Sequence, residues 1–132
     1  MRPAPPGARF PPVEKRIPTV AQVVHRAVVI ADPDGTDPAT AQLLAAFEDD
    51  DRAAPGLSHS LAEELRTTVE GLDPEGDSAA AEVAAAVAAF LATDPSAEGE
   101  PRETIRVAAR IAWGEFAPDH VARWLAARGV DI

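Results

Sequence analysis

Apolar residues recur at every third or fourth position in several segments of this 132-residue chain, and this spacing most constrains its fold. Such a rhythm places the apolar side chains on one face of a helix. In the first segment these residues are Val20, Val23, Val24, Ala27 and Val28. Thr19 and Gln22 have the spacing of a capping box, so we expect a helix that begins at Thr19.

Three more segments with apolar faces follow helix-starting signals, such as an N-cap before proline or a second capping box. The first of these predicted helices begins after the N-cap Asp37 and reaches Phe47. The second begins at the capping box 60–63. The third begins at Asp77 or Ser78 and runs through Ala92. The alanines of the last of these segments would let neighbouring helices approach closely.

Proline also starts two predicted helices near the end of the chain. Pro101 and Pro118 each suit the first helical position, where the missing N–H costs nothing. The final helix is expected to end at Arg128, with Gly129 in a Schellman motif and Val130 touching the preceding turn. We therefore predict helices at both places.

The predicted fold is all-α, a compact bundle of five or six short helices. Residues 19–132 form this single domain, and residues 1–18 form a flexible, extended arm. Six of the thirteen prolines lie in the arm, and proline cannot donate to a helix or sheet ladder. The alternative for residues 27–32 is a strand, because valine and isoleucine are frequent there. A lone strand has no ladder partner, so we expect helix.

Charge is distributed unevenly along the chain, whose formal net charge is -10. Residues 1–19 carry a net +3, residues 32–100 carry seventeen acids against two arginines, and residues 101–132 carry a net +1. Either these segments neutralise one another or one of them faces an oppositely charged partner. The acidic balance argues against binding to nucleic acid or to an anionic membrane, so we expect neither.

The residue types present exclude several kinds of site. Because the chain has no cysteine, disulfides, thiol nucleophiles and thiolate metal sites are ruled out. His59 and Glu63 share a helical face, but two ligands do not make a metal site. The acidic turn 32–37 lacks the glycine and glutamate positions of a calcium loop. We expect no metal, no cofactor and no catalytic residue, and an enzyme remains the weakest alternative.

An arginine occupies every fourth position of the segment 101–116. Arg102, Arg106 and Arg110 would form a row on one side of the helix, with Trp113 inside the same arc. Ile105, Ala109, Ala112 and Phe116 would face the core. We expect the row to pair with acids of the middle segments, such as Glu63, Glu64, Glu70 or Glu82. A row facing outward would instead bind an acidic protein or phosphates, with Trp113 as an aromatic anchor.

The leading hypothesis is a small protein-interaction module, an accessory or regulatory subunit. Its arm would dock on another protein through Phe10 and the flanking Arg9, Pro11 and Pro12, since a preformed extended segment loses little entropy on binding. The row Arg102, Arg106 and Arg110 with Trp113 would be its helical binding face. The alternative is a nucleic-acid-associated regulator or an acidic inhibitor that mimics DNA.

The expected location is the cytoplasm. The basic start of the chain is not followed by an apolar run that could serve as a secretory signal. The expected partner is another protein, in a hetero-complex or a homo-oligomer. The sequence leaves its identity open.

Overall fold

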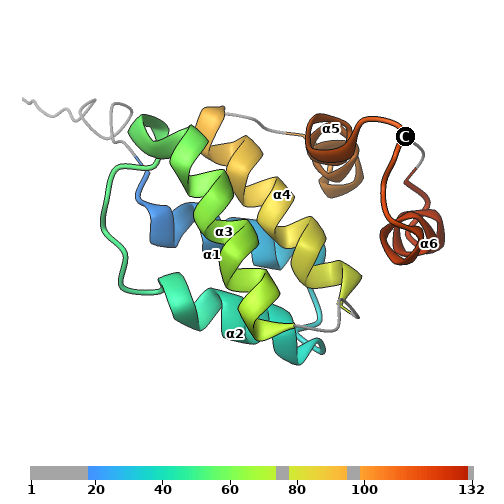
Figure 1. Cartoon of the computed structure of the whole chain (residues 1–132), viewed down its shortest axis with the longest axis horizontal. Coiled ribbons are helices and arrows are strands. Elements are labelled where there is room, and N and C mark those ends of the chain that lie inside the picture. The colour runs from blue at the N-terminus through green and yellow to red at the C-terminus, as the bar shows by residue number, and fades with distance from the viewer. Residues whose placement is uncertain (1–17, 74–77, 95–98, 131–132) are drawn as a thin grey trace, which may run out of the picture.

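The computed structural model describes residues 18–73, 78–94 and 99–130 (Figure 1). Within these ranges the chain forms α-helices and one short 3₁₀ turn, and no strand. The elements are α1 (Val20–Ala31), α2 (Pro38–Phe47), η3 (Pro55–Leu57), α3 (Ser58–Leu72), α4 (Ala79–Thr93), α5 (Pro101–Trp113) and α6 (Asp119–Ala127). The all-α prediction is confirmed, and residues 27–31 are helix rather than strand.

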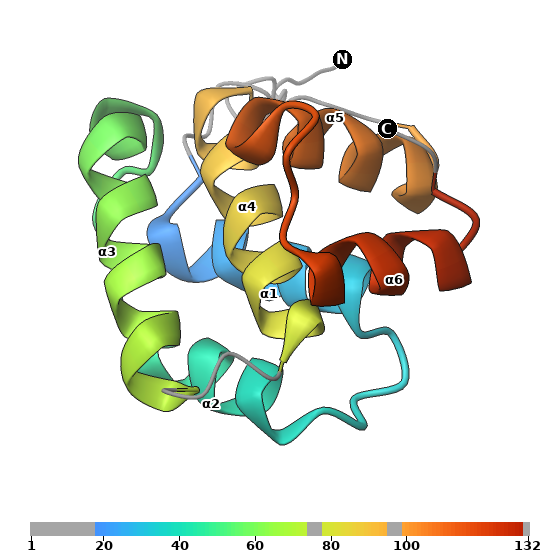
Figure 2. The ribbon, with the colours of Figure 1, turned by 45° about the vertical axis from the view of Figure 1, so that its right-hand side comes forward.

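Helix α4 is the centre of the bundle. It packs on α1 and α3, on the shorter α2, and on α5 and α6 (Figure 2). Ten of its residues are buried, most of them alanines. Because alanine projects little beyond the backbone, the surrounding helices can approach α4 from several sides. Helices α5 and α6 pack chiefly on α4, on one side of the bundle.

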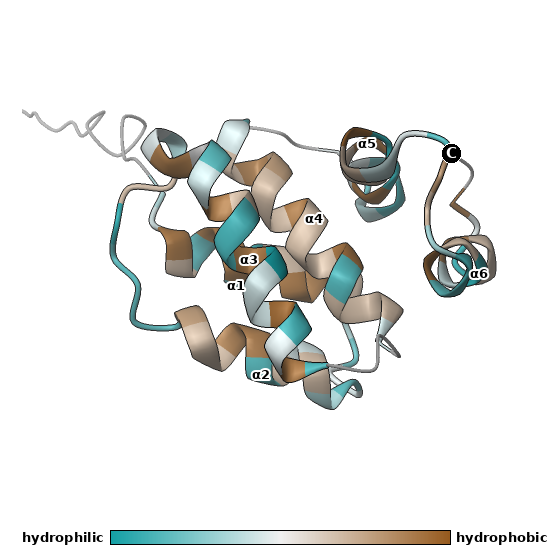
Figure 3. Ribbon diagram, viewed as in Figure 1, coloured by the Kyte–Doolittle hydropathy of each residue, from teal (hydrophilic) through white to brown (hydrophobic). Residues whose placement is uncertain are grey.

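The core is built from the apolar faces that the spacing predicts. Its largest fully buried side chains are leucines and valines: Leu43, Leu61, Leu65, Leu91, Leu125, Val20, Val24, Val83, Val87 and Val121. Figure 3 shows the contrast between these apolar helices and the polar loop that joins α2 to α3. Within the described residues, no helix is both long and apolar enough to cross a bilayer.

The predicted start of α1 is confirmed in detail. The Thr19 side chain accepts a hydrogen bond from the Gln22 N–H, and Gln22 returns one from the Thr19 N–H. The remaining free N–H groups of Val20 and Ala21 donate to the backbone carbonyls of Arg52 and Asp50, both at 2.9 Å. The acidic loop after α2 therefore completes the cap of α1.

Most other predicted ends are also correct. Asp37 and Ser78 cap α2 and α4 through their side chains. The Schellman motif is present, because the Val130 N–H donates to Leu125 and the Gly129 N–H donates to Ala126. Pro118 is the N-cap of α6 rather than its first residue.

The capping box predicted at residues 60–63 is wrong. Helix α3 begins two residues earlier, at Ser58, directly after the 3₁₀ turn. The Ser60 hydroxyl donates to the Leu57 carbonyl at 3.2 Å instead of accepting a backbone N–H. The 3₁₀ turn starts the helical winding and so makes the later serine an interior residue.

Candidate functional site

The arginine row lies along the outer edge of α5. Arg102 and Arg110 are exposed, while Arg106 and Trp113 are half-buried. Ile105 and Ala109 are buried as predicted, so the two faces of the helix were assigned correctly over its first turns.

An open groove lies beside the start of this row. It has a volume of about 530 Å³ and is lined by Glu100, Arg102, Glu103, Arg106, Gly129 and Val130. The walls come from the first turns of α5 and from Gly129 and Val130, which follow the end of α6. Two members of the row therefore share a groove that the sequence alone does not reveal.

The expected pairing of the row with the middle segments is not found for three of the four expected glutamates. Glu63 lies 3.8 Å from Arg66, Glu64 accepts hydrogen bonds from Arg52, and Glu82 pairs with His120. Arg106 instead pairs with Glu103 one turn earlier on its own helix, and these hydrogen bonds lower the pKa of Glu103. Glu63, Glu64 and Glu82 thus pair with residues outside the row.

Large apolar side chains are exposed at the C-terminal end of α5. Ile111 is 69% exposed and Phe116 is 87% exposed. Ala112 is exposed as well, and Trp113 is half-buried against the core. The prediction that Ala112 and Phe116 face the core is therefore wrong.

Gly114 explains the position of Phe116. Helix α5 ends at Trp113, and Gly114 has φ 64° and ψ -122°. The Phe116 N–H donates to the Trp113 carbonyl at 3.0 Å, so residues 113–116 form a type II′ turn. This turn breaks the helical register before Phe116. The glycine between two aromatic residues is the signal in the sequence that could have revealed it.

The acidic turn after α1 is held together by hydrogen bonds to the buried carboxylate of Asp32. Asp32 is 5% exposed, and its carboxylate accepts hydrogen bonds from the Thr40 hydroxyl at 2.7 Å and from the backbone N–H groups of Asp37 and Thr36. Burial by itself raises the pKa of Asp32, but these donors outweigh it and the pKa is lowered. The carboxylate thus accepts hydrogen bonds both within the turn and from α2.

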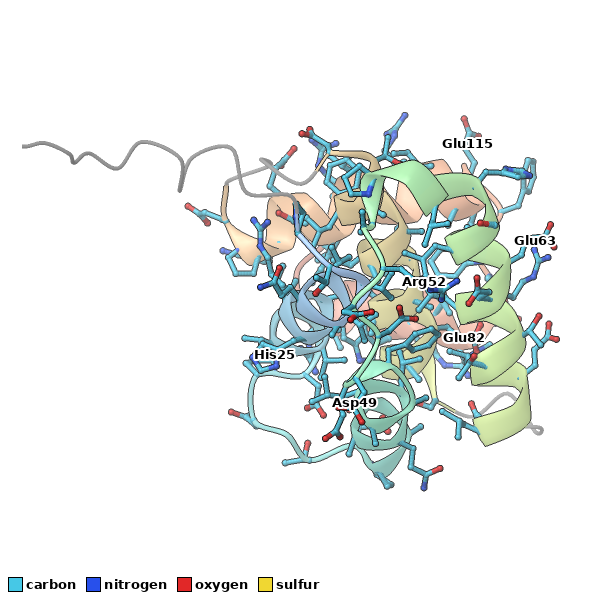
Figure 4. All side chains as sticks on the ribbon, turned by 90° about the vertical axis from the view of Figure 1, so that its left-hand side faces the viewer. His25, Asp49, Arg52, Glu63, Glu82 and Glu115 are labelled. Carbon is cyan, nitrogen blue, oxygen red and sulfur yellow. The ribbon has the colours of Figure 1, made fainter. Side chains whose placement is uncertain are left out.

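A second groove lies between the end of α2, the following loop and the middle of α3. We call it the acidic groove; its volume is about 490 Å³ and it is lined by Ala46, Phe47, Asp50, Glu63, Glu64, Thr67 and Thr68. Arg52 crosses from the loop to α3 and donates to both Asp50 and Glu64 (Figure 4). These hydrogen bonds lower the pKa of Asp50 and of Glu64.

The histidines do not build a site. His25 on α1 and His59 on α3 are exposed. His120 on α6 pairs with Glu82 on α4 and so ties these two helices together. Among the described residues, no three histidine or carboxylate side chains come together as metal ligands.

The arm residues Arg9, Phe10, Pro11 and Pro12 lie outside the described residues. Comparisons with protein-family models, with curated proteins and with solved structures find no match to this chain.

Proposed function

We propose that this protein is an interaction module, an accessory or regulatory subunit, whose helical bundle holds α5 as a docking surface. The partner is a protein segment that carries both acidic and large apolar side chains. The surface consists of the arginine row and the apolar end of α5, namely Arg102, Arg106, Arg110, Ile111, Trp113 and Phe116.

The exposure of Ile111 and Phe116 carries this proposal. A single exposed apolar side chain is ordinary, but these two lie within six residues, Ile111 in the last turn of α5 and Phe116 three residues after its end. The glycine turn that follows Trp113 keeps Phe116 out of the core. Binding of a partner that covers both side chains buries apolar surface that is exposed in the isolated chain. This burial contributes about 25 cal/mol for each Å² of apolar surface.

The charge of the same helix favours an acidic partner. Arg110 is exposed and directly precedes Ile111 in the sequence, and Arg102 lines the groove at the other end of the row. Charges at the rim of an interface mainly speed association and select partners by sign. The protein as a whole is acidic, so an acidic partner must approach α5 rather than the α2–α3 side. The arm, with Phe10 as its anchor, is a second proposed contact.

Affinity capture on the immobilised full-length chain tests the proposal. The double variant Ile111→Gln, Phe116→Gln removes the apolar contacts without touching the core, and Arg110→Glu reverses one charge of the row. We expect each to lower retention of the partner by at least tenfold. The matched control is Val29→Gln, because Val29 is 50% exposed on α1 and lies away from α5.

Equal retention by all variants would reject α5 as the docking surface. Thermal unfolding of each variant checks that the bundle is intact, since all four positions are exposed. Trp113 and Trp124 provide the fluorescence signal for this measurement.

Nucleic acid is the alternative ligand for the row. Contacts to phosphates would make the binding constant fall steeply with salt, with a slope near one for each phosphate neutralised. Titration of a fluorescent oligonucleotide at two salt concentrations therefore separates the two ligands. We expect no binding at physiological salt, and salt-sensitive binding that is lost in Arg110→Glu would favour nucleic acid over a protein.

A further inference from the structure

The acidic groove has both apolar and acidic lining residues. Ala46 and Phe47 supply apolar surface, and Asp50, Glu63 and Glu64 supply carboxylates. The surrounding segment 48–66 holds six acids against Arg52 and Arg66. Both arginines are already paired with acids of this segment, and a net charge of -4 remains over it.

The proline-rich arm joins the fold at the edge of this groove. The Pro18 carbonyl accepts a hydrogen bond from the Ala54 N–H at 3.0 Å, and the Ala21 N–H donates to Asp50, which lines the groove. Residues 1–17 carry four basic residues against Glu14, a net charge of +3. A positive segment is thus attached next to a negative groove.

We propose that residues 1–17 bind the acidic groove of their own chain. Lys15 and Arg16 are separated by Ile17 from the attachment point at Pro18 and face the acids that line the groove. Phe10 covers the apolar lining that Ala46 and Phe47 provide. Six residues lie between Phe10 and Ile17, and an extended chain spans about 3.3 Å per residue, so Phe10 can reach across the groove.

Attachment favours this occupant over a separate molecule. A segment held by a short linker has an effective concentration on the order of millimolar at a neighbouring site. A contact too weak to form between separate molecules is then populated within one chain. The contact needs no other protein, so it can fail or hold independently of the docking surface on α5. While Phe10 occupies the groove, a partner that also binds the arm must first displace it.

A spin label on the arm of the full-length protein tests the contact. Because the chain has no cysteine, Ala8→Cys provides a single attachment site. We expect the amide signals of residues 63–68 to lose at least half their intensity relative to the reduced label, and those of residues 119–127 to keep theirs. The loss should disappear at about 0.5 M NaCl, where the Debye length falls to a few Å.

A label on the arm lies near residue 18 simply because the arm is attached there, even without a specific contact. Charge reversal in the groove separates these two cases. Glu63→Lys should at least halve the effect on residues 64–68. Glu70→Lys is the matched control, because Glu70 is an exposed acid of the same helix outside the groove. An equal effect of the two variants, or an even loss over the whole bundle, would overturn the proposal.

A mixed sample tests whether the contact lies within one chain. Labelled protein without nitrogen-15 is combined with nitrogen-15 protein that lacks the spin label. We expect the signals of residues 63–68 to keep their intensity in this mixture. Loss of intensity there would show that the arm of another copy occupies the groove, and the proposal would be wrong.

Discussion

Asp32 links the end of α1 to the start of α2. Its carboxylate accepts hydrogen bonds from the Thr40 hydroxyl and from two backbone N–H groups in a buried position. An amide at this place has one acceptor oxygen and would direct its own N–H groups at the remaining donors. Removing one partner of a buried, charge-assisted hydrogen bond typically costs 1.5 to 3 kcal/mol.

We predict that Asp32→Asn lowers the free energy of unfolding by about 2 to 3 kcal/mol at pH 7. Urea unfolding followed by tryptophan fluorescence measures this. Asp34→Asn is the control, because Asp34 is exposed in the same turn, and we expect a change below about 0.5 kcal/mol. Equal effects of the two variants would contradict the structural role of Asp32.

The same residue gives a pH dependence. The pKa of Asp32 in the folded chain is lowered from its ordinary value, so its ionised form stabilises the fold. This stabilisation is complete above the unfolded pKa of about 4 and is lost as the pH falls through the lowered folded pKa. The difference between wild type and Asp32→Asn should therefore narrow when unfolding is measured at pH 3 rather than pH 7.

At the scale of single helices, two glycines are expected to respond to alanine in opposite directions. Gly71 lies in the last turn of α3 with open space around its Cα, whereas Gly129 has φ 75° and a Cβ there would lie 3.1 Å from the Arg102 side chain. We predict that Gly71→Ala stabilises by about 0.5 kcal/mol, because alanine favours the helix. Gly129→Ala should destabilise by about 1 to 2 kcal/mol through backbone strain. Urea midpoints of both variants check the signs.

Arg128 joins the end of α6 to the end of α1. Its guanidinium donates to the Ala31 carbonyl at 3.1 Å and lies 4.3 Å from the ring centre of Trp124. A cation at a helix C-terminus and a cation on an aromatic ring each contribute about 0.5 to 1 kcal/mol. We predict that Arg128→Ala lowers stability by about 1 kcal/mol and speeds amide exchange at the end of α1. Arg123→Ala, an exposed arginine of the same helix, should change neither.

Helix boundaries and faces followed well from local patterns, because caps and apolar spacing act within a few residues. The starts of α1, α2, α4 and α5 depend on such signals and were predicted correctly. Phe116 was misplaced because Gly114 ends the helix, so the spacing beyond it no longer describes a helical face. The sequence predicted correctly which edge of α5 carries the arginine row, but it did not predict which acids lie near that row. Which acids it meets depends on how helices are arranged around α4, and local patterns carry no such information.

Across the whole molecule, negative charge exceeds what the ion pairs of the described residues offset. The net charge is -10, and the pairs Arg66–Glu63 and Arg106–Glu103 join side chains that are largely exposed. Exposed pairs contribute between zero and about 1 kcal/mol each. Repulsion among the acids is spread over the surface and favours the expanded chain.

Salt should therefore stabilise this protein, because screening weakens the repulsion more than it weakens a few exposed pairs. We predict that the urea midpoint rises between about 20 mM and 300 mM NaCl, where the Debye length falls from roughly 20 Å to under 6 Å. The double variant Asp49→Asn, Asp51→Asn removes two exposed acids of the loop after α2. It should be more stable than wild type at low salt and should respond less to added salt. Arg52→Gln is the opposing case, since it leaves Asp50 and Glu64 without their shared cation and should enlarge the salt response. A midpoint that falls with salt in the wild-type protein would mean that attraction between charged groups, rather than repulsion, dominates the electrostatics of the fold.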